Sequence, residues 1–242
     1  MVLKLPQRVK YAALSIASLC LFTGTNSASE SITPAASHDH PAPVVLAPGY
    51  AALEFTPPKA GSYALPPMGN AGNGAVLDTQ GNAHMLHDYF GEKITVLSFI
   101  YTTCTDVNGC PLATFVFKSV QNTVLEDPAI RDHVRLLSFS FDPQQDSPEV
   151  LGAYAQHFKK PGFDWQFLTT HSIVELDPIL AAYGQSVIRD YDSEGNFLGS
   201  MSHILRVFLI DTNNRIRNIY STSYLHADTV ANDIRTLLYE SH

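Results

Sequence analysis

Cys104 and Cys110, separated by five residues, are the side chains of this chain whose type and spacing could most readily do chemistry. A thiolate is both a nucleophile and a metal ligand, so a close thiol pair can exchange disulfides or hold a soft metal ion. The one further cysteine, Cys20, lies in an apolar N-terminal segment that we expect to be removed. The mature chain would then keep a single thiol pair.

The spacing of the two cysteines predicts that they meet across a loop. On one continuous helix they would lie about 9 Å apart along the axis and on roughly opposite faces. Residues 106–109 include Asp, Asn and Gly, which favour turns, and such a loop can bring two α-carbons within the disulfide range of about 4.4 to 6.8 Å. Pro111 predicts a helix start, so Cys110 is expected at a helix N-terminus, where the dipole favours a thiolate.

A structural disulfide is the plain alternative for this pair. By the chain-entropy relation, closing a ring of about seven residues contributes only roughly 2 kcal/mol. A domain with an ample hydrophobic core gains little from so short a ring. The pair therefore favours a redox or metal-binding role.

The N-terminus predicts export. Lys4, Arg8 and Lys10 precede an uncharged run over Tyr11–Phe22, which small polar residues follow, and this is the layout of a secretory signal peptide over residues 1–28. An uncleaved anchor is the alternative. We expect a periplasmic location or one on the outer face of the inner membrane, where disulfides form and persist.

The remaining chain divides into a tether and a domain. Residues 29–68 are rich in proline and alanine and predict a flexible tether, which could link the domain to a membrane, whereas residues 69–242 suit one domain. The formal net charge is −8 and becomes −11 without residues 1–28, which carry three basic and no acidic residues. A chain this acidic is a poor candidate for binding nucleic acid.

The order of the expected elements predicts the fold class. Turn signals and apolar runs favour two hairpins and three single strands: Ala75–Asp78 with Ala83–Leu86, Ile204–Ile210 with Arg215–Tyr220, Ile94–Tyr101, Val134–Phe141 and Trp165–Leu168. Helices are expected over Pro111–Leu125, from Asp146 or Ser147 to before Pro161, over Ile173–Tyr183 and over Asp228–Tyr239. This order predicts an α/β protein with a thioredoxin-like fold, a central mixed sheet flanked by helices, and an N-terminal β-hairpin extension.

Three segments carry a resemblance to a known family. They are YTTCTDVNGCPLATF, SFSFDPQQDSPEVL and SHILRVFLIDTNNRIRNIY, which resemble successive motifs of the SCO/SenC family over most of residues 69–242. The resemblance implies a metallochaperone that delivers copper for respiratory cytochrome oxidase assembly; if the protein is an enzyme, the expected activity is that of a thiol–disulfide reductase. Its implied partners are an oxidase subunit or its copper-site apoprotein and a copper donor protein.

The same resemblance implies that Cys104, Cys110 and His203 bind one copper ion, as Cu(I) or Cu(II). Thiolates select Cu(I) and imidazole suits copper, and three ligands leave a position open for transfer. His203 is expected on a loop facing the thiols. The chain departs from the family pattern in two places: it has C-x5-C where the family usually has C-x3-C, and Ser202 stands where the family commonly places an Asp before the histidine.

Three other functions use the same residues. A thiol–disulfide oxidoreductase needs only a reactive thiolate and a resolving cysteine, although thioredoxins use C-x-x-C and carry a proline where His203 stands. Thiol peroxidases place a threonine three residues before the reactive cysteine, and here Tyr101 occupies that position. Structural zinc sites want four protein ligands, and the sequence offers three.

Overall fold

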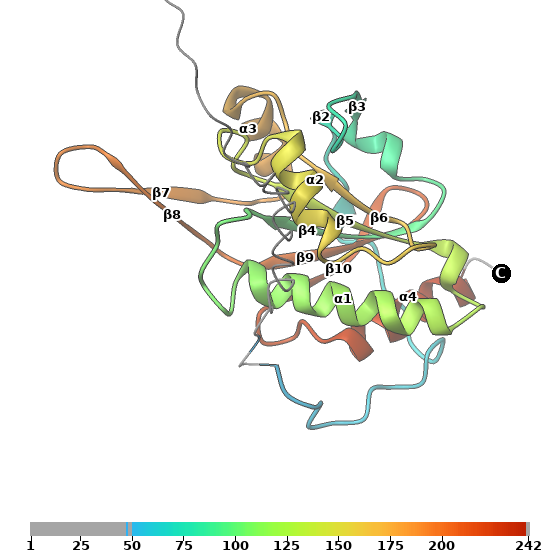
Figure 1. The fold of residues 1–242 in the computed structure, drawn as a ribbon. Helices are drawn as coiled ribbons and strands as arrows, with labels where there is room; N and C mark the ends of the chain where they lie inside the picture. The colour runs from blue at the N-terminus through green and yellow to red at the C-terminus, as the bar shows by residue number, and fades with distance from the viewer. Residues whose placement is uncertain (1–46, 48–49, 241–242) are drawn as a thin grey trace, which may run out of the picture. The chain divides into compact units, whose positions relative to one another are not determined.

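A mixed sheet of six strands, in the order β1-β10-β9-β4-β5-β6, forms the centre of the fold (Figure 1). The computed structural model describes residue 47 and residues 50–240, so the predicted signal over 1–28 lies outside the described residues. The six strands are β1 (Gly69–Asn70), β4 (Ile94–Ile100), β5 (Val134–Ser140), β6 (Trp165–Leu168), β9 (Arg206–Ile210) and β10 (Arg215–Ser221). Strands β4, β5 and β6 run parallel, while β9, β10 and β1 are antiparallel to their neighbours.

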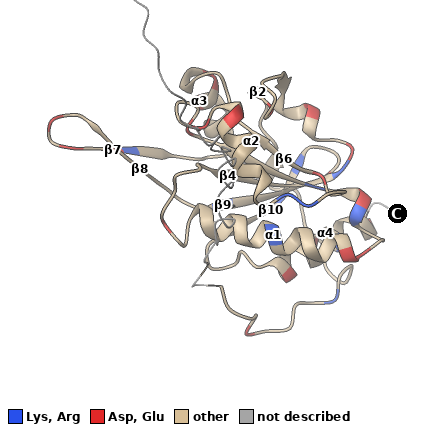
Figure 2. Cartoon of the chain, viewed as in Figure 1, with Lys and Arg blue, Asp and Glu red and all other residues tan. Residues whose placement is uncertain are grey.

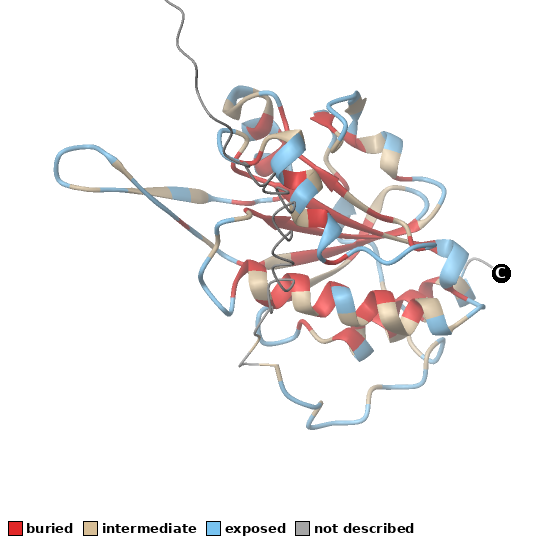
Figure 3. Cartoon of the chain, in the orientation of Figure 1, coloured by how far each residue is buried: buried red, intermediate tan, exposed pale blue. Residues whose placement is uncertain are grey.

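The two central strands are covered on both faces. All seven residues of β4 and six of the seven in β5 are buried, and the parallel register pairs Ile94 with Val134 and Ile100 with Ser140 (Figure 3). Continuous apolar runs are expected of parallel strands that lie between two layers of helices. The apolar runs in the sequence therefore predicted this part of the sheet.

Helices α1 and α4 cover one face of the sheet, and α2 and α3 lie on the other (Figure 1). Their bounds are α1 (Cys110–Glu126), α2 (Pro148–Gln156), α3 (Ile173–Ala182) and α4 (Ala227–Glu240), with short 3-10 turns η1 (Leu86–Tyr89) and η2 (Arg131–His133). Pro111 occupies the first turn of α1, as its fixed φ favours. Ser147 caps α2 by accepting a hydrogen bond from the N–H of Val150 at 3.3 Å. This is the thioredoxin-like arrangement that the element order predicted.

The predicted N-terminal hairpin is confirmed as a separate two-stranded sheet of β2 (Ala75–Leu77) and β3 (Ala83–Met85). Its turn is built on Asp78, whose carboxylate Oδ1 accepts hydrogen bonds from the N–H groups of Gln80 (2.9 Å) and Asn82 (2.8 Å). Gly81 takes the positive φ of 82° that closes the turn.

A second two-stranded sheet was not predicted. Strands β7 (Val187–Tyr191) and β8 (Phe197–His203) pair as an antiparallel ribbon that projects from the rest of the domain (Figure 1), and we call residues 187–203 the arm. The strand predicted over Ile204–Ile210 consequently begins only at Arg206. The arm escaped prediction because its strands, VIRDY and FLGSMSH, do not alternate apolar and polar residues, and Met201 alone of their twelve residues is buried.

The residues before β1 contact the domain. Tyr63 donates a hydrogen bond to the buried carboxylate of Asp233 on α4 at 2.5 Å, and the N–H of Gly61 donates to Thr236 at 3.1 Å. The described part of the predicted tether, up to Met68, contains neither helix nor strand. Among the helices of the described residues, none is long and apolar enough to cross a membrane.

Candidate metal and thiol centre

The predicted loop between the two cysteines is confirmed. Cys110 is the first residue of α1 and is only 1 % exposed, while Cys104 lies half-buried in the loop after β4, and both are free thiols. The loop is closed by two short turns, in which the N–H of Cys104 donates to the carbonyl of Tyr101 (3.3 Å) and the N–H of Gly109 donates to the carbonyl of Asp106 (2.9 Å). The loop thereby brings the two thiols within hydrogen-bonding distance of each other.

The half-buried thiol is the acidic one. Hydrogen bonding from the Cys110 thiol, together with the N–H groups of Cys110 and Asp106 and the Tyr101 hydroxyl, lowers the pKa of Cys104 to about 6 against the opposing effect of burial. At neutral pH Cys104 is therefore mostly a thiolate, the form that attacks disulfides and binds soft metals.

The opposite holds for Cys110, which corrects the sequence expectation. Its place at the helix N-terminus was expected to favour a thiolate there. Burial raises the pKa of Cys110 well above its ordinary value, and the hydrogen bond to Cys104 and the charge of that sulfur add to the effect. Desolvation of the charged form thus outweighs the helix dipole, and the Cys110 proton is shared with Cys104.

His203 is the last residue of β8 and not a loop residue as expected. Its ring packs against Phe141, with centroids 4.7 Å apart, and its Nε2 is buried without a hydrogen-bond partner among the described residues. Burial lowers the pKa of His203, while the nearby Asp106 carboxylate partly opposes that shift. A neutral imidazole with a free nitrogen is the form that binds metals.

The three expected ligands are only partly gathered. The thiols are paired, but across the described residues no group of three or more His, Cys, Asp or Glu side chains is close enough to hold a metal ion. The unpartnered Nε2 of His203 and the thiolate of Cys104 are nevertheless a soft donor set that suits copper. The candidate site therefore consists of two free thiols that lie together, Cys104 and Cys110, and a histidine that lies apart from them.

Contacts at the base of the arm hold His203 near the sheet. The guanidinium of Arg189 on β7 lies 3.4 Å from the carboxylate of Asp142, which follows β5 and is 1 % exposed. The Tyr101 hydroxyl reaches the carbonyl of Met201 on β8 at 3.5 Å. Phe141 joins these contacts through its ring packing with both Tyr101 (5.1 Å) and His203.

Asp146 anchors the start of the cysteine loop. The sequence predicted that the helix begins at Asp146 or Ser147; in the structure Ser147 caps α2 and the Asp146 carboxylate is fully buried. It accepts hydrogen bonds from the N–H of Thr102 at 3.0 Å, from the Thr102 hydroxyl and from the Ser140 hydroxyl at 2.5 Å. Burial raises the pKa of Asp146 in spite of these bonds. The carboxylate fixes the chain two residues before Cys104.

Comparison with known proteins places this architecture in one family. A sequence model described as SCO1/SenC matches residues 73–239, which include both cysteines and His203. The SCO1 protein homolog of Bacillus subtilis (strain 168) is 26 % identical over 113 residues. That match covers 47 % of this chain and 56 % of the relative, so it spans about half of the relative's length.

Solved structures share the fold. ScoI of Arabidopsis thaliana, determined with copper bound, superposes with a TM-score of 0.59 at 18 % identity and covers 70 % of this chain and 98 % of that one. ScoI of Bradyrhizobium japonicum, also with copper bound, gives a TM-score of 0.57 at 23 % identity over 69 % of this chain and 99 % of that one. These likenesses establish the fold, and the family match extends over most of the domain. The chain belongs to the SCO1/SenC family.

Proposed function

We propose that this protein binds copper on Cys104, Cys110 and His203 and delivers it for cytochrome oxidase assembly. The observation that carries the proposal is a thiolate at Cys104 beside a second thiol, with an unpartnered imidazole nitrogen at the end of β8. Membership of the SCO1/SenC family and the copper-bound relatives support it. Copper is the transferred substrate of this protein, and its proposed acceptor is a copper-site apoprotein of the oxidase.

The two thiols would take different parts in receiving copper. Cys104 is already ionised at neutral pH and can bind the ion first, whereas Cys110 must release its proton to become the second ligand. Copper affinity should therefore fall as the pH falls, because protons compete for both sulfurs. Ligands that protons can displace also allow the copper ion to leave for an acceptor protein.

His203 would complete the set from the arm. Since the described residues hold no three-donor cluster, binding the imidazole requires the base of β8 and the cysteine loop to approach each other. Ser202 supplies no carboxylate to orient the ring, so packing against Phe141 is the contact that fixes its plane. The thiols would capture the ion and the histidine would close on it.

Anaerobic Cu(I) titration of the reduced protein against a competing chelator tests the site. Cys104→Ser and Cys110→Ser are each expected to weaken binding by more than about 100-fold, beyond the 10- to 100-fold typical of residues that only support a ligand. His157→Ala, which removes an exposed histidine after α2, is the matched control and should leave binding unchanged. Undiminished binding in either cysteine variant would refute the site.

A thiol–disulfide oxidoreductase is the second candidate, favoured by the low pKa of Cys104 beside a buried resolving thiol. The Cys104 thiolate would attack a client disulfide, form a mixed disulfide and release one client thiolate. Cys110 would lose its proton, attack the Cys104 sulfur and release the second client thiolate. The client gains two electrons and this protein is left with a Cys104–Cys110 disulfide. Rapid reduction of insulin without measurable Cu(I) affinity would favour this function.

Export also belongs to the proposal. The basic start and apolar run of residues 1–28 support secretion to the periplasm or to the outer face of the inner membrane. Cell fractionation with N-terminal sequencing of the recovered protein checks both location and cleavage.

A further inference from the structure

The arm is joined to the rest of the domain through one pair of facing residues, Arg189 on β7 and Met201 on β8. Across the part of the chain that the structure describes, the hydrogen bonds and ion pairs between the arm and other elements come from these two residues. Arg189 pairs with Asp142, and the carbonyl of Met201 lies 3.5 Å from the Tyr101 hydroxyl, which donates to it. His203 lies two residues beyond Met201 on the same strand, so the attachment of this pair sets where the histidine lies.

The ion pair of Arg189 with Asp142 is largely shielded from water. The Nη1 atom of Arg189 lies 3.4 Å from Oδ1 of Asp142, and the two side chains are 17 % and 2 % exposed. The same Nη1 lies 3.4 Å from the sulfur of Met201, and the guanidinium carbon lies 5.7 Å from the ring centroid of Phe197. A buried carboxylate that loses its partner is left as an uncompensated charge. The ion pair thus ties both strands of the arm to one buried carboxylate.

Two consecutive residues after β5 contact both strands of the arm. Asp142 pairs with Arg189 on β7, and the ring of Phe141 packs against His203 on β8 with centroids 4.7 Å apart. In the register of the arm the partner of His203 is Val187, two residues before Arg189. Release of Arg189 from Asp142 would therefore let the end of β8 move away from Phe141.

We propose that Arg189 is a positioning residue of the copper site, whose ion pair with Asp142 holds the end of β8 and thereby the ring of His203. An imidazole held in one place loses less conformational freedom when it binds an ion, so Arg189 would raise copper affinity without contacting copper. This copper consequence rests on the proposed function. The position of the His203 ring does not depend on it and can be measured in the copper-free protein.

Nuclear magnetic resonance of the reduced, copper-free full-length protein tests the position of the ring. Arg189→Gln removes the charge and keeps a polar, unbranched side chain. The ring protons of His203 should then shift toward the values of an unpacked histidine, because the ring current of Phe141 no longer acts on them at a fixed distance. Signals that stay at their wild-type values would overturn the inference.

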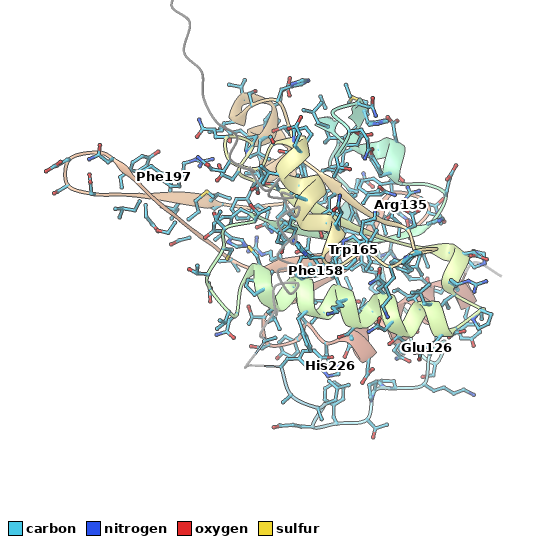
Figure 4. All side chains as sticks on the ribbon, viewed as in Figure 1. Glu126, Arg135, Phe158, Trp165, Phe197 and His226 are labelled. Atoms are coloured by element: carbon cyan, nitrogen blue, oxygen red, sulfur yellow. The ribbon has the colours of Figure 1, made fainter. Side chains whose placement is uncertain are left out.

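The chain offers a matched control in a second shielded ion pair. Arg135 on β5 lies well away from the arm (Figure 4), and its Nε lies 2.9 Å from the carboxylate of Asp164, with side chains 13 % and 16 % exposed. Arg135→Gln should leave the His203 signals and the Cu(I) affinity at their wild-type values. Shifts of equal size in Arg135→Gln and Arg189→Gln would mean that loss of any shielded ion pair disturbs His203, and would also overturn the inference.

Two further variants test the ion pair itself. The contact to Asp142 is a single one from Nη1, so the ammonium group of Arg189→Lys can replace it and should restore the His203 signals. Asp142→Asn removes the charge of the other partner and should reproduce the shift, and it serves as the test should Arg189→Gln not fold. Equal shifts in Arg189→Lys and Arg189→Gln, or wild-type signals in Asp142→Asn, would overturn the inference.

Cu(I) titration tests whether Arg189 acts through His203. Arg189→Gln should bind Cu(I) about tenfold more weakly than wild type, the lower end of the effects of residues that support a ligand. Added to His203→Ala, Arg189→Gln should cause no further loss, because the effects of residues that act together are not additive. Equal losses in both backgrounds would overturn the inference. Wild-type protein that binds no Cu(I) would refute the proposed function, whereas the His203 signals would still decide the role of Arg189.

Discussion

The central sheet and the arm contribute to the same candidate site but differ in how far their strands are buried. Strands β4 and β5 are buried along nearly their whole length, whereas β7 and β8 are exposed or half-buried at all residues but Met201 (Figure 3). The thiols belong to the loop and helix that follow β4, and His203 belongs to the arm. The proposed ligand set would therefore join a region held by core packing to a region held by a few contacts at its base.

The side chains of the two regions show the same contrast. Trp165 and Phe158 lie within the core with ring centroids 6.4 Å apart, while Phe197 lies out on the arm (Figure 4). The sequence of the arm has one basic residue, Arg189, followed by the three acidic residues Asp190, Asp192 and Glu194, and Figure 2 shows the arm with blue on β7 and red towards its tip. An exposed ribbon with this composition gains its order from pairing and from its base and not from apolar burial.

The largest expected effect is on the sheet. Phe99 of β4 is 1 % exposed and packs against the rings of Phe139, Tyr183 and Phe208. Phe99→Ala should lower the free energy of unfolding by about 3 to 5 kcal/mol, because it removes a buried ring and leaves a cavity. Urea denaturation measures it, and a loss below about 1 kcal/mol would break the contrast between sheet and arm.

His203→Ala tests the base of the arm. Cu(I) affinity should fall by about 10- to 100-fold, while stability should change little because relief of the unpartnered Nε2 offsets the lost packing against Phe141. Chelator competition and thermal unfolding of the same samples separate the two effects. A large loss of stability with unchanged affinity would make His203 a packing residue.

The pH dependence of alkylation sharpens the difference between the two thiols. The rate of Cys104 modification by iodoacetamide should be half-maximal at about pH 6 and fall roughly tenfold per unit below it, since only the thiolate reacts. Cys110, 1 % exposed and with a raised pKa, should stay unmodified in the folded protein. Mass spectrometry of the digested protein identifies the labelled cysteine, and first labelling at Cys110 would reverse the assignment.

The lowered pKa of Cys104 also makes the free energy of unfolding depend on pH. The pKa of Cys104 is lowered on folding, so its contribution to stability is present above the pKa of an unfolded cysteine, about 8.5, and is lost as the pH falls through about 6. Urea midpoints of reduced wild type and Cys104→Ser should therefore diverge between pH 6 and 9. Parallel curves would contradict the lowered pKa.

The smallest effect is expected on the arm. Leu198 of β8 is 61 % exposed, so Leu198→Ser should change the free energy of unfolding by less than about 0.5 kcal/mol. Leu198→Ser and Phe99→Ala both replace an apolar residue on a strand, and urea denaturation measures the loss of stability in each. A loss of several kcal/mol would show that the arm is packed against something more than its base.

The sequence predicted the parts of the fold where a single physical signal dominates. Apolar runs marked β4 and β5, and Pro111 marked the start of α1. The relative acidity of the two thiols was predicted wrongly, because the helix dipole can be inferred from local sequence while burial of Cys110 depends on residues distant in the chain. The ligand role of His203 came from resemblance and stays a prediction.

A signal for the missed arm was present in the sequence. Asp192-Ser-Glu-Gly-Asn196 repeats the pattern of Asp78-Thr-Gln-Gly-Asn82, which was recognised as a hairpin turn. In both turns the aspartate Oδ1 accepts N–H bonds from residues two and four positions later, and the glycine has a positive φ. The second copy was overlooked because the strands beside it lack an apolar face.

The unpartnered Nε2 of His203 has a thermodynamic consequence. A buried polar atom without a partner destabilises the fold by about 1 to 3 kcal/mol, and a ligand that engages it relieves that penalty. Any ligand that binds only the folded protein raises its stability, by about 2.7 kcal/mol at a free concentration 100 times the Kd. The melting temperature of the protein would then report its copper load, and cells that sense unfolding would retain the loaded form longer than the empty one.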